Sequence, residues 1–121
     1  MNYNIKGTGI PITDELRAYA EKRLASLDKF LNDKEAARTD VELELSPLVD
    51  GPKYRAEMML HDPGARVMRA EARGTALHEA IDLAAGELFS ELTRSKKKRL
   101  HLLRHGAVKV KEYLRGWRTK I

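Results

Sequence analysis

The chain has 121 residues, a formal net charge of +5 and no cysteine. This length suits one domain with a modest core, and the lack of cysteine excludes disulfides and thiolate metal sites. The N-terminus has no apolar signal-peptide core and no stretch approaches transmembrane length, so we expect a cytoplasmic protein without a membrane partner.

The charge is distributed very unevenly along the chain. Residues 1–93 carry 12 basic and 17 acidic side chains, a net of −5, whereas residues 94–121 carry 11 basic and one acidic, a net of +10. Such an asymmetry indicates contact with a polyanion, either a nucleic acid or an anionic membrane surface, at the C-terminal end.

The N-terminal third predicts a strand followed by a helix. The strand covers residues 2–6, and Thr13 is the expected N-cap of a helix that ends near Phe30. Its apolar stripe comprises Leu16, Ala20, Leu24, Leu27 and Leu31.

Three segments of alternating polarity follow. Residues 39–46, 53–61 and 66–73 each place apolar side chains on one face and mostly charged ones on the other, which is typical of half-buried strands. A loop at 47–52 and an Asp-Pro-Gly turn at 62–64 separate them, so we expect an antiparallel meander.

One long helix is predicted from Thr75, its expected N-cap, to Arg104, with Gly106 as a stop signal. Leu77, Ile81, Ala84, Leu88 and Leu92 form its apolar stripe. Thirty helical residues measure about 45 Å, whereas an eight-residue strand measures about 27 Å. The helix should therefore extend past the sheet.

The expected fold class is α+β with the order β-α-β-β-β-α. Both helices should cover one face of a four-stranded sheet and leave the other face charged and solvated. We expect residues 1–104 to form this domain and residues 105–121 to form a basic amphipathic tail. Trp117 in that tail is either a plug for the core or an anchor for a partner.

The sequence shows no constellation of nucleophile and base, so we expect no catalytic residues, no cofactor and no small-molecule substrate. His101 and His105 stand four residues apart, but solvated or RNA-facing imidazoles are the better interpretation, and no metal site is expected. Glu79 and Asp82 are expected to be ordinary exposed residues of the helix surface.

The basic side chains of both helices are the candidate RNA-binding residues. Those around the protruding helix end lie in a stretch without compensating acids, so an external anion would relieve their repulsion. Arg23 sits at the edge of its helix's apolar stripe, from which its head group can reach between the helices. The candidates are Lys22, Arg23, Lys29, Arg94, Lys96, Lys97, Lys98, Arg99 and Arg104.

Several stretches within residues 1–100 resemble the ribosome hibernation-promoting factors of the protein Y family, in their short form. They are ITDELRAYAEKRLASLDKF, the alternating strands, the HDPG turn, the AEARG-to-helix junction and ALHEAIDLAAGEL. The resemblance implies a β-α-β-β-β-α domain that binds the small ribosomal subunit through rRNA, in the channel used by mRNA and tRNA. It implies silencing of idle ribosomes without catalysis.

By position, the resemblance carries RNA contact over to Arg23 and Lys29 on the first helix and to Arg94 and Lys96 on the second. Acidic or neutral residues stand where family members often place basic ones along the second helix. These are Glu87, Ser90 and Thr93. The positive charge is thus displaced toward the helix end.

Two other functions compete with this one. A general double-stranded RNA-binding module also packs two helices on an antiparallel sheet, but it begins with a helix and places its lysines at the start of its last helix. A membrane-surface protein could use the tail as an amphipathic anchor, although four apolar side chains are too few for firm binding.

Overall fold

The computed structural model describes residues 1–48, 50–65 and 67–105, with the backbone alone for 95–105. The elements follow the expected order. They are β1 (Asn2–Thr8), α1 (Asp14–Ala25), a 3₁₀ turn η1 (Asp28–Phe30), β2 (Arg38–Leu45), β3 (Tyr54–His61), β4 (Met68–Gly74) and α2 (Leu77–His105). The fold class is therefore the predicted α+β fold.

The four strands form one mixed sheet in the order β1-β2-β3-β4. β1 runs parallel to β2, and the later strands form the predicted antiparallel meander. The register aligns Ile5, Val41, Met58 and Ala70 across the sheet, and all four are buried. The alternation in the sequence therefore identified the core face of each strand correctly.

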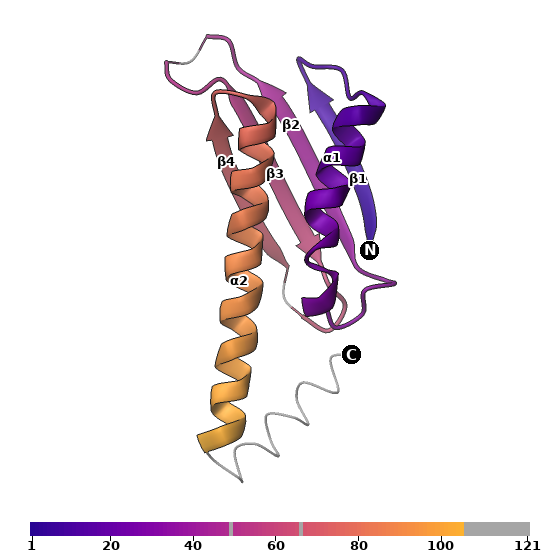
Figure 1. Ribbon diagram of the computed structural model, residues 1–121, viewed down its shortest axis with the longest axis vertical. Helices are drawn as coiled ribbons and strands as arrows, with labels where there is room; N and C mark the ends of the chain where they lie inside the picture. Colours follow the sequence, from indigo (N-terminus) through magenta and orange to yellow (C-terminus); the bar gives the residue numbers. More distant parts are fainter. Residues whose placement is uncertain (49, 66, 106–121) are drawn as a thin grey trace.

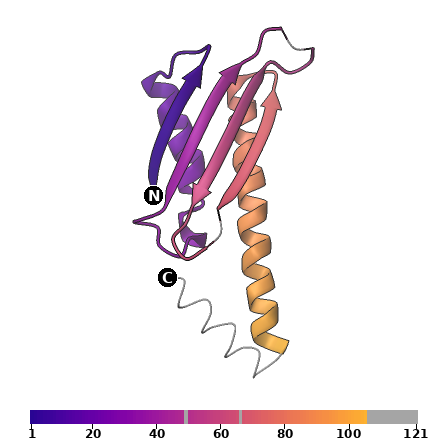
Figure 2. The same cartoon turned by 180° about the vertical axis from the view of Figure 1, so that it is seen from behind.

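Both helices cover the same face of the sheet, and the other face is open (Figures 1 and 2). The predicted cap of α1 is confirmed, because Thr13 Oγ1 accepts a hydrogen bond of 3.1 Å from the backbone N–H of Leu16. The stripes of the two helices meet in one core with the strands. Leu24, Leu27, Ile81 and Leu88 are almost completely buried there.

Two details of the predicted helices were wrong. The first helix ends at Ala25 rather than near Phe30, because the chain tightens into η1 after Ser26, whose hydroxyl bonds back to the Arg23 carbonyl. Thr75 does not cap α2 as expected. Its hydroxyl donates to the Glu79 carboxylate, and the first turn begins from the Ala76 carbonyl.

A buried carboxylate joins the β3–β4 turn to the segment after η1. The Asp62 side chain, 6% exposed, accepts hydrogen bonds from the backbone N–H groups of Asn32 (2.9 Å) and Asp33 (3.2 Å). Asp62 therefore fixes the exit of η1, the turn that carries Lys29 and Phe30.

The helix α2 extends well past the end of the sheet, as its length predicted (Figure 1). Its N-terminal half packs on β3 and β4, whereas the protruding end lies beyond them. The expected stop at Gly106 and the tail 105–121 with Trp117 lie outside the described residues, apart from the backbone of His105.

Candidate nucleic-acid interface

The two helices meet along a line of polar and aromatic contacts, which we call the helix seam. It consists of Tyr19, Arg23 and Phe30 on one side and His78, Asp82 and Phe89 on the other. The Tyr19 and His78 rings lie edge to face with centroids 4.3 Å apart. Further along α2, the Phe30 and Phe89 rings meet at 5.4 Å.

Asp82 is the hub of the seam, contrary to its expected role as an ordinary surface residue. Its Oδ1 accepts a 2.7 Å hydrogen bond from the Tyr19 hydroxyl and lies 2.8 Å from Arg23 Nε. The Arg23 contact is an ion pair rather than an aligned hydrogen bond. The hydrogen bond to Asp82, followed by burial, raises the pKa of Tyr19.

Arg23 reaches from α1 to α2, as its position at the edge of the stripe predicted. Its side chain remains 42% exposed, so an anion can still approach it. Asp82 nevertheless offsets its charge, which makes Arg23 a positioned cation rather than a free one.

Two further candidates have exposed side chains: Lys22 in the last turn of α1, and Lys29 in η1. Lys22 has no ion pair with any side chain that the structure describes. Lys29 Nζ lies 5.2 Å from the centroid of the Phe30 ring, within the range of a cation–π interaction. The structure therefore brings Arg23 next to α2 at Asp82, and it places Lys29 beside Phe30, whose ring meets Phe89 of α2.

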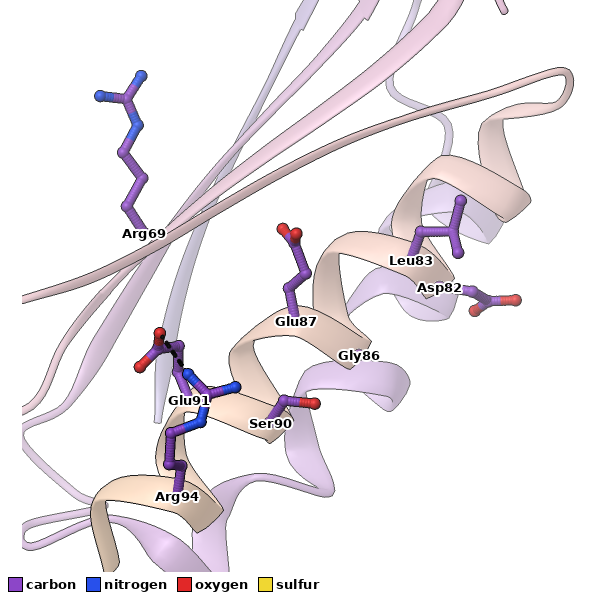
Figure 3. A pocket seen from close by; sticks show the side chains of 8 residues that line it. All are labelled: Arg69, Asp82, Leu83, Gly86, Glu87, Ser90, Glu91 and Arg94. Carbon is purple, nitrogen blue, oxygen red and sulfur yellow. Dashed lines mark hydrogen bonds and ion pairs between the residues drawn. The ribbon is translucent and has the colours of Figure 1, made fainter. Parts of the chain in front are cut away.

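Arg94 faces a different surface. It lines a shallow hollow of about 570 Å³ between α2 and the free edge of β4, and its Nη1 lies 3.3 Å from Glu91 Oε1 (Figure 3). Glu87 in the same hollow accepts a hydrogen bond from the backbone N–H of Glu71 on that edge. Asp82, Glu87 and Glu91 outnumber the two arginines there, so this flank is a poor site for an anion.

The remaining candidates are Lys96, Lys97, Lys98, Arg99 and Arg104, whose backbone forms the protruding end of α2. Their side chains lie outside the described residues, so their role as RNA contacts stays a prediction. The course of the backbone places these five cationic residues within ten consecutive positions, in the part of α2 that extends beyond the sheet (Figure 1).

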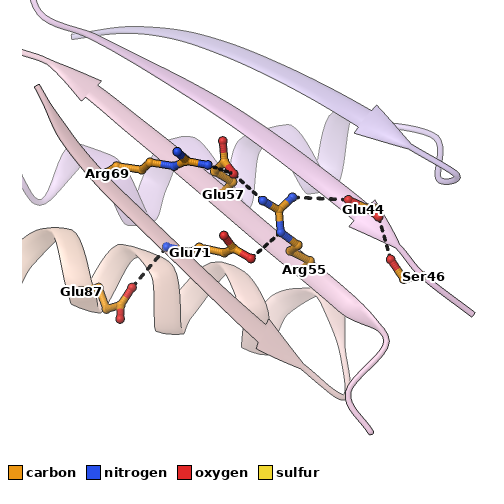
Figure 4. A network of polar contacts seen from close by, with 7 residues as sticks. All are labelled: Glu44, Ser46, Arg55, Glu57, Arg69, Glu71 and Glu87. Atoms are coloured by element: carbon orange, nitrogen blue, oxygen red, sulfur yellow. Dashed lines mark hydrogen bonds and ion pairs between the residues drawn. The ribbon is translucent and has the colours of Figure 1, made fainter. Parts of the chain in front are cut away.

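The open face of the sheet is charged but neutralises itself. Arg55 there contacts Glu71 through Nε at 2.7 Å, Glu44 through Nη1 at 3.3 Å, and Glu57 through Nη2 (Figure 4). Arg69 adds a 2.8 Å contact to Glu57. Hydrogen bonds from Arg69 and Arg55 hold the pKa values of Glu57 and Glu71, respectively, below their usual range. These two arginines are committed to carboxylates and are therefore poor contacts for a polyanion.

The sequence reasoning missed three residues that shape this side of the molecule. The Asp-Pro-Gly sequence predicted a turn, but it did not predict that the Asp62 carboxylate would accept hydrogen bonds from a distant loop. Asp82 carried no local signal, because Tyr19 and Arg23 are about sixty residues away in the chain. Phe89 offered a weak signal, being a large apolar residue next to the stripe rather than in it.

In the residues that the structure describes, no group of three or more histidine or acidic side chains could hold a metal ion. Within the same part of the chain, no helix has the length and apolar character needed to span a membrane.

Comparison with known proteins places this fold in a family. Residues 3–100 match the family model described as sigma 54 modulation protein / S30EA ribosomal protein. The crystal structure of the Thermus thermophilus protein Y N-terminal domain is similar with a TM-score of 0.68 and 34% identity, over 78% of this chain and 98% of that one. A ribosomal subunit interface protein from Coxiella burnetii, at 19% identity and a TM-score of 0.63, shares the fold.

Curated relatives point the same way. A ribosome hibernation promoting factor of Azotobacter vinelandii is 32% identical over 83% of this chain and 87% of its own length. A ribosome hibernation promotion factor of Lactococcus lactis is 28% identical over 79% of this chain, which spans only half of that relative. With the matched order of elements and the family model over most of its length, the chain belongs to the ribosome hibernation-promoting factor and protein Y family.

Proposed function

We propose that this chain is a non-catalytic hibernation factor that occupies the mRNA and tRNA channel of the small ribosomal subunit. It contacts rRNA and inhibits translation by idle ribosomes in the cytoplasm. Family membership supports this proposal, and relatives bear names that describe hibernation and subunit-interface proteins. Residues 1–104 serve as the ribosome-binding domain, and 105–121 serve as an additional basic tail.

The observation that carries the proposal is the protruding end of α2. A helix that passes the sheet and carries a cationic run can enter a space lined by phosphates while its other half stays anchored in the core. Arginine and lysine side chains in such a run position the helix on the phosphate backbone and do not read bases. The exposed Lys22 and Lys29 extend the cationic surface to α1 and η1.

A general double-stranded RNA-binding module is the alternative. Its sheet has three strands and follows a helix, whereas here β1 begins the domain and pairs in parallel with β2. The cationic run also lies at the end of the last helix rather than at its start. Both features favour the ribosomal target.

The first test is sedimentation of the protein with purified small subunits through a sucrose gradient, with filter binding to a plain RNA duplex at matched salt. We expect at least tenfold preference for the subunit, because two helices must dock on a folded surface rather than along one groove. Equal affinities would favour the double-stranded RNA module, and no comigration with the subunit would refute the proposal.

A salt titration tests the role of the helix end. Replacing Lys96, Lys97, Lys98 and Arg99 by glutamine should weaken subunit binding and leave the thermal melt unchanged, because glutamine is a comparable helix former. If three of the four touch phosphate, the slope of log affinity against log salt should flatten by about 2 to 3.

A matched control instead removes four charges on or next to the open face of the sheet, in the variant K6Q/R38Q/K53Q/R73Q, where Lys53 directly precedes β3. All four side chains are exposed there. Its salt slope should equal that of the wild type. Equal slopes for all three proteins would mean that the run at the end of α2 is only a solvated helix end.

A further inference from the structure

In the aromatic pair at the lower part of the helix seam, Phe30 packs against the core, but Phe89 is not explained by the core. Phe89 is 42% exposed, although its neighbour Leu88 and the next stripe residue Leu92 are buried. The stripe already closes the contact of α2 with the sheet, and Phe89 follows it by one residue, about 100° further around the helix. It therefore points along the seam toward η1, where it meets Phe30.

The geometry of the pair leaves an aromatic face available. The two rings are nearly perpendicular, at 82°, with centroids 5.4 Å apart. In such an edge-to-face contact, each ring keeps at least one face that the other does not cover. Lys29 lies over the Phe30 ring, whereas no described cation or second ring covers the exposed part of Phe89.

The charge around the pair suits an anionic ligand. Lys29 stands 5.2 Å from the Phe30 centroid and is exposed. Burial first, and then the carboxylate of Asp28, raises the pKa of Tyr3 on β1. Glu91 is paired with Arg94 on the opposite flank.

A ligand for this place must combine a flat aromatic face with a negative charge, and a nucleotide does so. Proteins bind unpaired bases with aromatic side chains and nearby cations, because every base has a π-face and every nucleotide carries a phosphate. Among the described residues of α2, the large apolar side chains that are exposed are Leu83 and Phe89. A single exposed ring suits one base better than an apolar protein surface.

We propose that Phe89, supported by Phe30 and Lys29, is a stacking site for one unpaired RNA base, with Lys29 receiving an adjacent phosphate. This site rests on the proposed function, because the base would come from single-stranded rRNA of the subunit. The stacking contact of Phe89 would be independent of the cationic helix end and insensitive to salt, whereas the phosphate contact of Lys29 would depend on salt.

Two variants separate stacking from packing. Phe89→Leu keeps an apolar side chain and a good helix former but removes the ring, whereas Phe89→Tyr keeps the ring. Loss of one base stack corresponds to at least about a fivefold loss of affinity, the lower end of measured effects. We therefore expect Phe89→Leu to bind small subunits at least about fivefold more weakly, with an unchanged salt slope, and Phe89→Tyr to bind like the wild type.

A second measurement addresses the base itself. The full chain is titrated with a uridine decamer and with an abasic decamer that has the same phosphates. The wild type and Phe89→Tyr should prefer the uridine decamer by about fivefold, and Phe89→Leu should lose that preference. Equal preference in the wild type and Phe89→Leu would overturn the stacking site, as would parallel losses of melting temperature and affinity in both variants. Failure of the wild type to bind subunits, with the uridine preference intact, would refute the proposed function and retain the site.

Discussion

Removal of the Asp62 carboxylate should be the most costly single polar change in this domain. Its two oxygens accept from two backbone N–H groups at 2.9 and 3.2 Å, and the residue is 6% exposed. Hydrogen bonds to a charged group contribute about 1.5–3 kcal/mol each. Water can reach part of the freed backbone, so the lower value applies, and Asp62→Ala should lower the free energy of unfolding by about 3 kcal/mol.

Asp62→Asn provides a graded comparison. The amide keeps one acceptor oxygen without charge and loses the other, so we expect about half the loss, near 1.5 kcal/mol. Asp50→Ala removes an exposed carboxylate from the β2–β3 loop and should stay within about 0.5 kcal/mol of the wild type.

Urea unfolding followed by far-ultraviolet circular dichroism measures all three variants. A loss of 3 kcal/mol corresponds to a fall in melting temperature of about 12 °C for a domain of this size. The reasoning would be refuted if Asp62→Ala unfolded within 0.5 kcal/mol of the wild type, or if Asp62→Asn cost as much as the alanine variant.

Three further predictions concern glycine, pH and the tail. Gly86→Ala should stabilise the domain by about 0.5–1 kcal/mol, because a Cβ at this position would meet nothing within 4 Å. Gly74→Ala should destabilise the domain, because its Cβ would lie 2.8 Å from the backbone nitrogen of Ala80. Thermal melts of the two variants test both expectations. The pKa values of Glu57 and Glu71 are lowered in the folded state, so these carboxylates stabilise the fold above the unfolded pKa of about 4.3. The free energy of unfolding should therefore fall as the pH drops through the folded pKa values. In an acid titration, an Arg55→Met variant should lose less stability than the wild type over the same pH range. Deletion of residues 106–121 should leave a cooperative melt and weaken subunit binding without abolishing it; loss of the melt would show that the tail belongs to the core.

The pattern of the sequence predicted the elements because their signals are local. The alternation in β2 and β3 and the stripe of α2 follow directly from burial on one face. The end of α1 was misplaced because Leu27 and Leu31 continue the helical spacing although η1 intervenes. The chain keeps its apolar side chains in register through a 3₁₀ turn, and periodicity cannot distinguish the two.

The chemistry of the seam could not be predicted because it depends on pairings across the fold. Asp82 gains its role only when α1 lies beside α2, and Phe89 gains its own only when η1 places Phe30 against it. The direction of β1 is likewise nonlocal, since the α1 crossover brings it back parallel to β2.

Competition with initiator tRNA on purified small subunits tests the central claim most directly. Labelled tRNA is bound to the subunits with mRNA, the protein is added up to stoichiometric excess, and retained tRNA is counted. Occupation of the channel predicts that tRNA is displaced at a molar ratio near one, and that the four-glutamine variant at Lys96–Arg99 requires more protein. Simultaneous binding of tRNA and protein at undiminished affinities would contradict the account.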